Sequence, residues 1–219
     1  MHNPHQLAAS IRDDRDNFDM RFAVGRGGEK DIASILLRAG YNVLETGQIA
    51  SATGAPKIAT PTTPIIVTDL FVWRGVVCRW VECKCKDSFT WHRNTQQFQF
   101  GINKHQVLDY QAAERTSPWP VFVMVIVRGG HVKDCPHKTS PKGLFGQKLS
   151  VLSKSIHHFD DKWGKSGMFY WNIDALHPID SVARESLKSL GIAISEPAIH
   201  LVEQPKQRDA QQLSLWGVR

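Results

Sequence analysis

Three residues, Asp69, Glu82 and Lys84, combine the side-chain types needed for metal-assisted hydrolysis of a phosphodiester. Asp69 lies in the apolar run PIIVTDLFVW, and the other two form a Glu-x-Lys pattern in the next apolar run. Mg²⁺ prefers oxygen ligands and often uses one or two carboxylates together with phosphate and water. A neighbouring lysine can orient the attacking water or stabilise charge in the transition state. Since Glu-x-Lys alone is typical of a solvated strand, the interpretation depends on where the flanking segments place these side chains.

The flanking segments predict a β-hairpin. Residues 65–73 and 76–85 are rich in Val, Ile, Phe and Trp, and Arg74-Gly75 separates them. This pattern favours two antiparallel strands joined by a two-residue turn, in which Asp69 pairs with Trp80.

The predicted hairpin gathers the chemical residues on one face of the sheet. Because side chains alternate along a strand, Asp69, Glu82 and Lys84 share one face and Cys83 lies on the other. Asp69 and Glu82 become diagonal neighbours, about 7–8 Å apart, so both carboxylates can reach one cation. The backbone carbonyl of Cys83 is a further candidate ligand.

A third carboxylate precedes these strands. Residues 25–40 begin with glycines, continue with apolar residues at helical spacing and end at Gly40, which predicts a helix followed by a strand over 41–44. Glu29 falls on the same side of this helix as Ile32 and Leu36, the side expected to face the sheet. An inward carboxylate is costly unless it is paired or bound to metal. The alternative is a first-turn glutamate favoured by the helix dipole.

These residues together resemble the PD-(D/E)XK nuclease superfamily over about residues 25–127, and their front part is similar to archaeal Holliday junction resolvases. The resemblance implies a restriction-endonuclease-like α/β fold, with a central mixed β-sheet flanked by helices. It implies that Asp69 and Glu82 bind Mg²⁺ or Mn²⁺, that Lys84 is the catalytic lysine, and that Glu29 is an additional acidic ligand. Thr68 occupies the position of the proline that gives the motif its name.

Residues 103–115 are expected to form a helix, on which Gln106 and Tyr110 share a face. Their spacing resembles an additional motif of RecB-like and phage exonucleases, which implies a role in positioning substrate. A polar pair at this spacing is also common on any exposed helix. The apolar run 120–127 predicts a strand buried on both faces.

Positive charge and aromatic residues near the predicted site favour DNA as the partner. The net charge is +6, which suits a polyanion. Residues 86–103 are interpreted as a loop, in which Lys86, Trp91 and Arg93, with Lys104 after it, contact backbone phosphate or unpaired bases. The aromatic residues of this segment could equally pack the loop down. Residues 46–64 contain many Gly, Pro, Ser and Thr and predict a second loop near the site.

Composition and length favour one α/β nuclease domain. The chain has 219 residues with 42% hydrophobic content, which suffices for one core. We expect an N-terminal extension over 1–24, the domain over 25–200 and a tail over 201–219. A strand is predicted near 167–176 and a capped helix over 180–190.

No signal peptide or membrane span is apparent, so a bacterial or phage protein of the cytoplasm is expected. The four cysteines have no spacing typical of a disulfide scaffold, and a zinc site is disfavoured.

The tail carries a second motif. After a polar segment come five residues that resemble the bacterial sliding-clamp-binding peptide, with tryptophan in the aromatic place: Gln212, Leu213, Ser214, Leu215 and Trp216. The resemblance implies that the apolar side chains fill a groove of the clamp while the glutamine fixes the register. The alternative is a terminal apolar patch that folds back on its own domain.

The sequence therefore predicts a Mg²⁺-dependent deoxyribonuclease of DNA repair, recombination or replication that is recruited by the sliding clamp. A branched-DNA endonuclease, such as a Holliday junction resolvase acting as a homodimer, and an exonuclease or single-strand nuclease both remain open. The alternative from another class is a non-catalytic DNA-binding or clamp-adaptor module.

Overall fold

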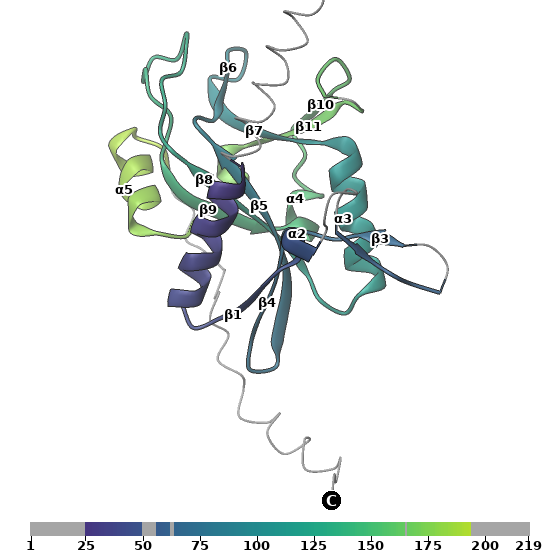
Figure 1. Cartoon of the computed structure of the whole chain (residues 1–219). Coiled ribbons are helices and arrows are strands. Elements are labelled where there is room, and N and C mark those ends of the chain that lie inside the picture. Colours follow the sequence, from purple (N-terminus) through teal and green to yellow (C-terminus); the bar gives the residue numbers. More distant parts are fainter. Residues whose placement is uncertain (1–24, 50–55, 62–63, 165, 194–219) are drawn as a thin grey trace, which may run out of the picture.

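The computed structural model describes residues 25–49, 56–61, 64–164 and 166–193 (Figure 1). A helix occupies residues 25–38. The other helical elements are α2 (Thr46–Ile49), α3 (Lys104–Thr116), α4 (Leu149–Leu152), the 3₁₀ helix η1 (Ile173–Ala175) and α5 (Ser181–Ser189). The strands are β1 (Asn42–Glu45), β2 (Lys57–Ile58), β3 (Ile65–Ile66), β4 (Leu70–Arg74), β5 (Val77–Lys86), β6 (Thr90–His92), β7 (Gln97–Asn103), β8 (Val121–Val127), β9 (Gly143–Lys148), β10 (His158–Asp160), β11 (Met168–Asn172) and β12 (His177–Pro178).

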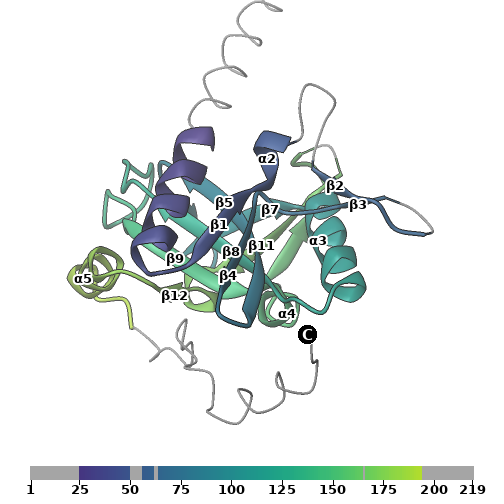
Figure 2. The same ribbon diagram turned by 60° about the horizontal axis from the view of Figure 1, so that its bottom comes forward.

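The centre of the fold is a six-stranded sheet in the order β1-β4-β5-β8-β9-β12. β5 and β8 are parallel, whereas the other neighbouring pairs are antiparallel, so the sheet is mixed. The helix of residues 25–38 packs on one face, and α3 and α4 lie with the second sheet on the other (Figures 1 and 2). The expected α/β class, with a central mixed sheet flanked by helices, is confirmed.

Several predicted elements are present with small shifts of their ends. The strand expected over 41–44 is β1, the helix expected over 103–115 is α3, and the run 120–127 is the almost fully buried strand β8. The capped helix expected over 180–190 is α5. Its N-cap residue Asp180 accepts a hydrogen bond from the backbone amide of Ala183 at 2.8 Å.

The interpretation of residues 86–103 as a loop is wrong. They contain β6 and β7, which belong to a second, four-stranded sheet in the order β10-β11-β7-β6. Along β7 the residues Phe98, Phe100 and Ile102 are buried in the core. The alternating residues form the other face of this sheet, so the period of two typical of a strand is present in the sequence. The predicted loop over 46–64 likewise contains α2 and β2, and residues 50–55 and 62–63 lie outside the described ranges.

The hairpin that carries the predicted site is present, but its register differs from the prediction. Trp73 pairs with Cys78, so Gly75 and Val76 form the turn in place of Arg74 and Gly75. The strand expected over 65–73 is also interrupted, because β3 pairs with β2 and β4 begins only at Leu70. The register shift is two residues. An even shift leaves every side chain on its predicted face.

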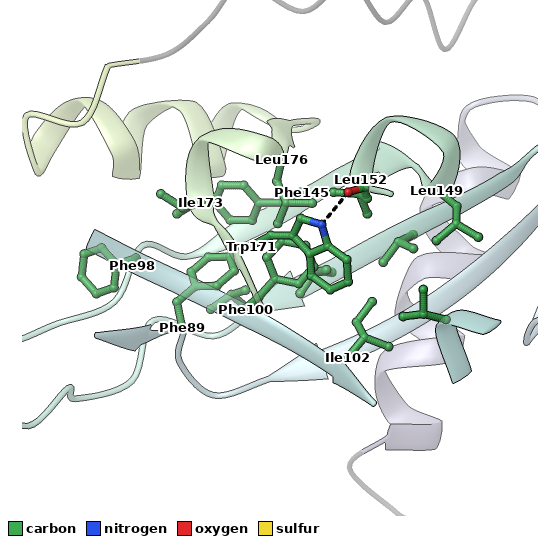
Figure 3. Packing of buried hydrophobic residues seen from close by; sticks show 14 of the residues in the cluster. Phe89, Phe98, Phe100, Ile102, Phe145, Leu149, Leu152, Trp171, Ile173 and Leu176 are labelled. Carbon is green, nitrogen blue, oxygen red and sulfur yellow. Dashed lines mark hydrogen bonds between the residues drawn. The ribbon is translucent and has the colours of Figure 1, made fainter. Parts of the chain in front are cut away.

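The core between the two sheets is aromatic (Figure 3). Trp171 of β11 is fully buried at its centre and stacks on Phe100, with the ring centroids 5.2 Å apart. Its indole nitrogen donates a hydrogen bond to the carbonyl of Leu152 at 2.7 Å. This bond satisfies the polar edge of a buried tryptophan and fixes α4 against the second sheet.

In the part of the chain that the structure describes, no helix combines the length and the apolar character that crossing a membrane requires.

Gly28 sets how closely the helix of residues 25–38 approaches β5. A Cβ atom at this position would lie 2.4 Å from the Cβ of Cys85, whereas a Cβ at Gly27 would meet nothing within 4 Å. We expect Gly28→Ala to lower the free energy of unfolding by about 1–3 kcal/mol, because the helix must shift away from the strand. Gly27→Ala, the matched control, should be neutral or slightly stabilising.

Urea unfolding of both variants, followed by circular dichroism, tests this packing. Equal midpoints for Gly28→Ala and Gly27→Ala would contradict the close approach of the helix to β5.

Candidate functional site

A single cavity of about 740 Å³ collects the residues that the sequence singled out for chemistry. It lies where the start of the helix of residues 25–38, the second half of β5, the end of β7 and α3 meet. The predicted residues that line it are Glu29, Asp69, Glu82, Cys83, Lys84, Lys86, Gln106 and Tyr110. Side chains from segments far apart in the sequence therefore face one space.

Asp69 is held from two sides. Its backbone carbonyl accepts hydrogen bonds from the amides of Thr46, at 2.9 Å, and Gly47, at 3.4 Å. Its carboxylate oxygen Oδ2 accepts a hydrogen bond from the amide of Cys83 at 2.9 Å. Asp69 immediately precedes β4, whose first residue, Leu70, pairs with Val81, so Asp69 lies beside Glu82 and Cys83 of β5.

Glu82 and Lys84 form an ion pair on β5. Glu82 is only 2% exposed, and its second carboxylate oxygen, Oε2, has no hydrogen-bond partner. A buried carboxylate oxygen normally has a partner, because the unsatisfied atom has lost its hydration. The unpaired oxygen therefore marks a position where a cation or a donor from a ligand can bind.

The carboxylates of the cavity repel one another. Burial, reinforced by the negative charge of Glu82, raises the pKa of Asp69 to about 8. Burial also raises the pKa of Glu29; the charge of Arg26 opposes this shift and that of Glu82 adds to it. Burial alone would lower the pKa of Lys84, but the carboxylates of Glu82 and Asp69 outweigh it and raise that pKa. This pattern is typical of a site prepared to accept positive charge.

The helix α3 contributes the second wall of the cavity. Gln106 and Tyr110 both line it, as their spacing predicted, and Asp109 lies beside them. Tyr110 is buried, and burial together with the Glu82 carboxylate raises the pKa of its hydroxyl far above the ordinary value. The phenol therefore stays protonated and can donate a hydrogen bond.

The sequence interpretation did not identify several lining residues. Asn103 and His105, at the start of α3, and Met168, on β11, also face the cavity. Asp109 could have been found from its place between Gln106 and Tyr110 on the same helix. Met168 could not, because its position depends on the pairing of β11 with β7.

The residues predicted to bind DNA occupy different places. Lys86 lines the cavity, where burial and the neighbouring charge of Lys84 lower its pKa. Lys104, at the start of α3, lies with its ammonium nitrogen 5.3 Å from the ring centroid of Phe159. Trp91 packs edge-on against Phe98, outside the cavity.

Arg93 is exposed, also outside the cavity, and forms an ion pair with Asp134. A role in DNA binding stays a prediction for these residues. The predicted clamp-binding residues 212–216 lie outside the described ranges.

The donor set fits Mg²⁺ better than a softer metal. Among the described residues, no three His, Cys, Asp or Glu side chains already surround a common position for an ion. Mg²⁺ does not require such a cage, because it commonly binds one or two carboxylates and keeps water and phosphate as its other ligands. Asp69 and Glu82, with the unpaired Oε2 atom, meet that requirement. The four cysteines are not joined by disulfide bonds.

Comparison with protein-family models gave no match, and comparison with curated proteins gave no significant one. Among solved structures, the chain is similar to Hjc, a Holliday junction resolvase from the archaeal hyperthermophile Archaeoglobus fulgidus. The match covers 74% of this chain and 99% of that chain, with 11% sequence identity and a TM-score of 0.42.

Proposed function

We propose that this chain is a Mg²⁺- or Mn²⁺-dependent deoxyribonuclease that hydrolyses DNA phosphodiester bonds. The observation that carries the proposal is the meeting of Glu29, Asp69, Glu82 and Lys84 in one cavity. Carboxylates that repel one another, an unpaired buried oxygen and a retained ammonium group suit a site for a hard cation and a phosphate. The volume of about 740 Å³ admits a phosphodiester with its flanking groups.

Asp69 and Glu82 are the residues that would hold the metal, with Glu29 as an additional ligand. The bound metal supplies a Lewis acid that polarises the phosphate and makes water more acidic. Lys84 keeps its proton because two carboxylates stabilise its charge, so its ammonium group can donate to a phosphate oxygen as negative charge develops there. Gln106 and the protonated Tyr110 add neutral donors on the opposite wall.

The preferred DNA structure separates the remaining alternatives. A branched-DNA endonuclease of the resolvase kind needs two sites related by a two-fold axis, so it acts as a dimer. An exonuclease or single-strand nuclease can act as a monomer on free ends. A panel of plasmid, single-stranded and four-way DNA, combined with light scattering of the protein, distinguishes these activities. A non-catalytic adaptor would bind the panel without cutting any member.

Replacing the catalytic lysine should separate chemistry from folding. We expect Lys84→Ala to reduce Mg²⁺-dependent cleavage at least about 100-fold, because charge that develops on the phosphate loses its donor. The variant should keep a cooperative melting transition at a lower midpoint, since buried Glu82 loses its cationic partner. Lys30→Ala, on the exposed side of the helix of residues 25–38, is the matched control.

EDTA should abolish cleavage by the wild type and by the control variant. If the wild type, Lys84→Ala and the EDTA-treated protein act alike on every substrate, the hydrolytic proposal fails and the adaptor alternative gains support.

The raised pKa of Asp69 predicts how metal-free stability depends on pH. Folded Asp69 retains its proton up to about pH 8, whereas the unfolded residue ionises near pH 4. The unfolded state therefore binds fewer protons between these values, and the free energy of unfolding falls as the pH rises from about 4 to about 8. Asp69→Asn should remove this contribution, because its amide oxygen can still accept from the amide of Cys83.

Urea unfolding in EDTA across this pH range measures the free energy of unfolding of the wild type and of Asp69→Asn. The variant should become increasingly more stable than the wild type as the pH rises towards 8. Added Mg²⁺ should then stabilise the wild type above pH 8 and have little effect on the variant. Parallel curves with and without the metal would show that Asp69 does not carry this role.

The tail motif supports recruitment by a bacterial sliding clamp. We expect deletion of residues 211–219 to leave the rate of cleavage of free DNA unchanged, because the candidate active-site residues lie elsewhere. The deletion should abolish co-elution with the clamp, since the peptide that fills its groove is lost. Size-exclusion chromatography of the mixed proteins provides the measurement, and co-elution that survives the deletion would remove the recruitment proposal.

A further inference from the structure

Trp163 differs from the other tryptophans of the described chain. Five of the six in that part of the chain contact another aromatic ring: Trp73, Trp80, Trp91, Trp119 and Trp171. Among the described residues, no aromatic ring packs on Trp163 and its indole N–H donates no hydrogen bond. Its exposed fraction is 62%, against 36% for Trp119. A large apolar side chain this exposed contributes little to folding and suits contact with a ligand.

The turn that carries Trp163 joins β10 to β11 and is fixed to the start of α3 (Figure 1). The amide of Lys104 donates to the carbonyl of Gly167 at 2.9 Å, and the amide of His105 donates to the hydroxyl of Ser166 at 3.1 Å. These bonds use amides in the first turn of a helix, which have no partner within the helix itself. The turn is therefore held by the same segment that begins a wall of the cavity.

The turn lies at the rim of the cavity. A Cβ on Gly164, the residue after Trp163, would be 2.1 Å from Oδ1 of Asn103, so the glycine backbone rests against that side chain. Asn103 lines the cavity, and so does Met168 at the other end of the same turn. Trp163 is thus connected through one glycine to a residue that faces the candidate active site.

Two lysines accompany this aromatic side chain, although Asp160 and Asp161 precede it in the sequence. Lys162 is exposed next to it in the sequence. The ammonium group of Lys104 lies over the ring of Phe159, which is itself partly exposed on β10. Cations interleaved with exposed aromatic rings are the combination with which proteins bind single-stranded nucleic acid, because the cations contact phosphate and the rings stack on bases.

We propose that Trp163 forms a stacking site for an unpaired nucleobase of a DNA strand whose backbone enters the cavity. This inference rests on the nuclease function proposed above and adds the substrate class: DNA with unpaired bases next to the bond that is cut. Bases within a duplex already stack on their neighbours, so they leave no free face for the indole. Lys104 and Lys162 contact phosphates on either side of the stacked base.

The test measures binding separately from cleavage. Fluorescence anisotropy in EDTA gives the affinity of the full-length protein for a labelled single-stranded oligonucleotide and for the matched duplex. We expect Trp163→Ala to weaken single-strand binding about tenfold, and Trp163→Phe to restore most of it, because a phenyl ring still stacks. Binding of duplex should change less than about twofold in both variants.

Val76→Ala is the control. Val76 is 60% exposed, about as much as Trp163, and lies at the opposite tip of the β4–β5 hairpin. The Val76→Ala variant should bind the single-stranded oligonucleotide and the duplex as the wild type does. A second readout is ultraviolet cross-linking of a 5-iododeoxyuridine oligonucleotide, followed by mass spectrometry, which should identify the peptide that contains Trp163. This readout does not depend on cleavage.

Unchanged single-strand binding by Trp163→Ala would overturn the proposal, and so would an equal loss for duplex and single strand, since the latter indicates a contact with backbone alone. Failure of the nuclease proposal would look different. The wild type would then cut no DNA with Mg²⁺, whereas the effect of Trp163→Ala on binding in EDTA would still decide whether the stacking site exists.

Discussion

The structure depends on keeping acidic side chains together in one partly buried place. Asp69 lies just before β4 and faces the same cavity as Glu82, and Lys84 is the cation paired with Glu82. Burial, with the charge of Glu82 added to it, raises the pKa of Asp69 although Lys84 acts in the opposite direction. Such a cluster persists only where the surrounding fold fixes its members. The surrounding strands and helices offset this repulsion with their own hydrogen bonds and packing.

The fold holds the cluster through its backbone. Amides of Thr46 and Gly47 bind the carbonyl of Asp69, and the amide of Cys83 binds its carboxylate. β5 is itself locked between β4 and β8, and its neighbour β8 is almost completely buried. The unfavourable electrostatic energy of the site is therefore offset by hydrogen bonds and burial that involve mostly other residues. This separation explains why changes to the site are expected to affect activity and pH dependence more than the fold itself.

The sequence predicted much of the site because the relevant pattern is local. Strand alternation placed Asp69, Glu82 and Lys84 on one face, and this result survived an error of two residues in the register. Helical spacing likewise brought Gln106 and Tyr110 to the same wall. The interpretation missed β6 and β7 although the period of two is present along β7, because polar and turn-forming residues surround these strands. The contribution of Met168 depends on pairing between distant strands, which no local pattern encodes.

The second sheet also closes one side of the cavity. With residues 86–103 as a loop, the site would be open on that side, and positive residues would reach DNA from a mobile segment. The observed β7 and β11 form a continuous wall instead, and the turn after β10 is hydrogen-bonded to the start of α3. A rigid rim loses little conformational entropy when a ligand binds. The backbone that carries Trp163 is held at this rim, so the stacking proposed for it would select for DNA structure, whereas the phosphodiester proposed to meet the carboxylates is common to every sequence.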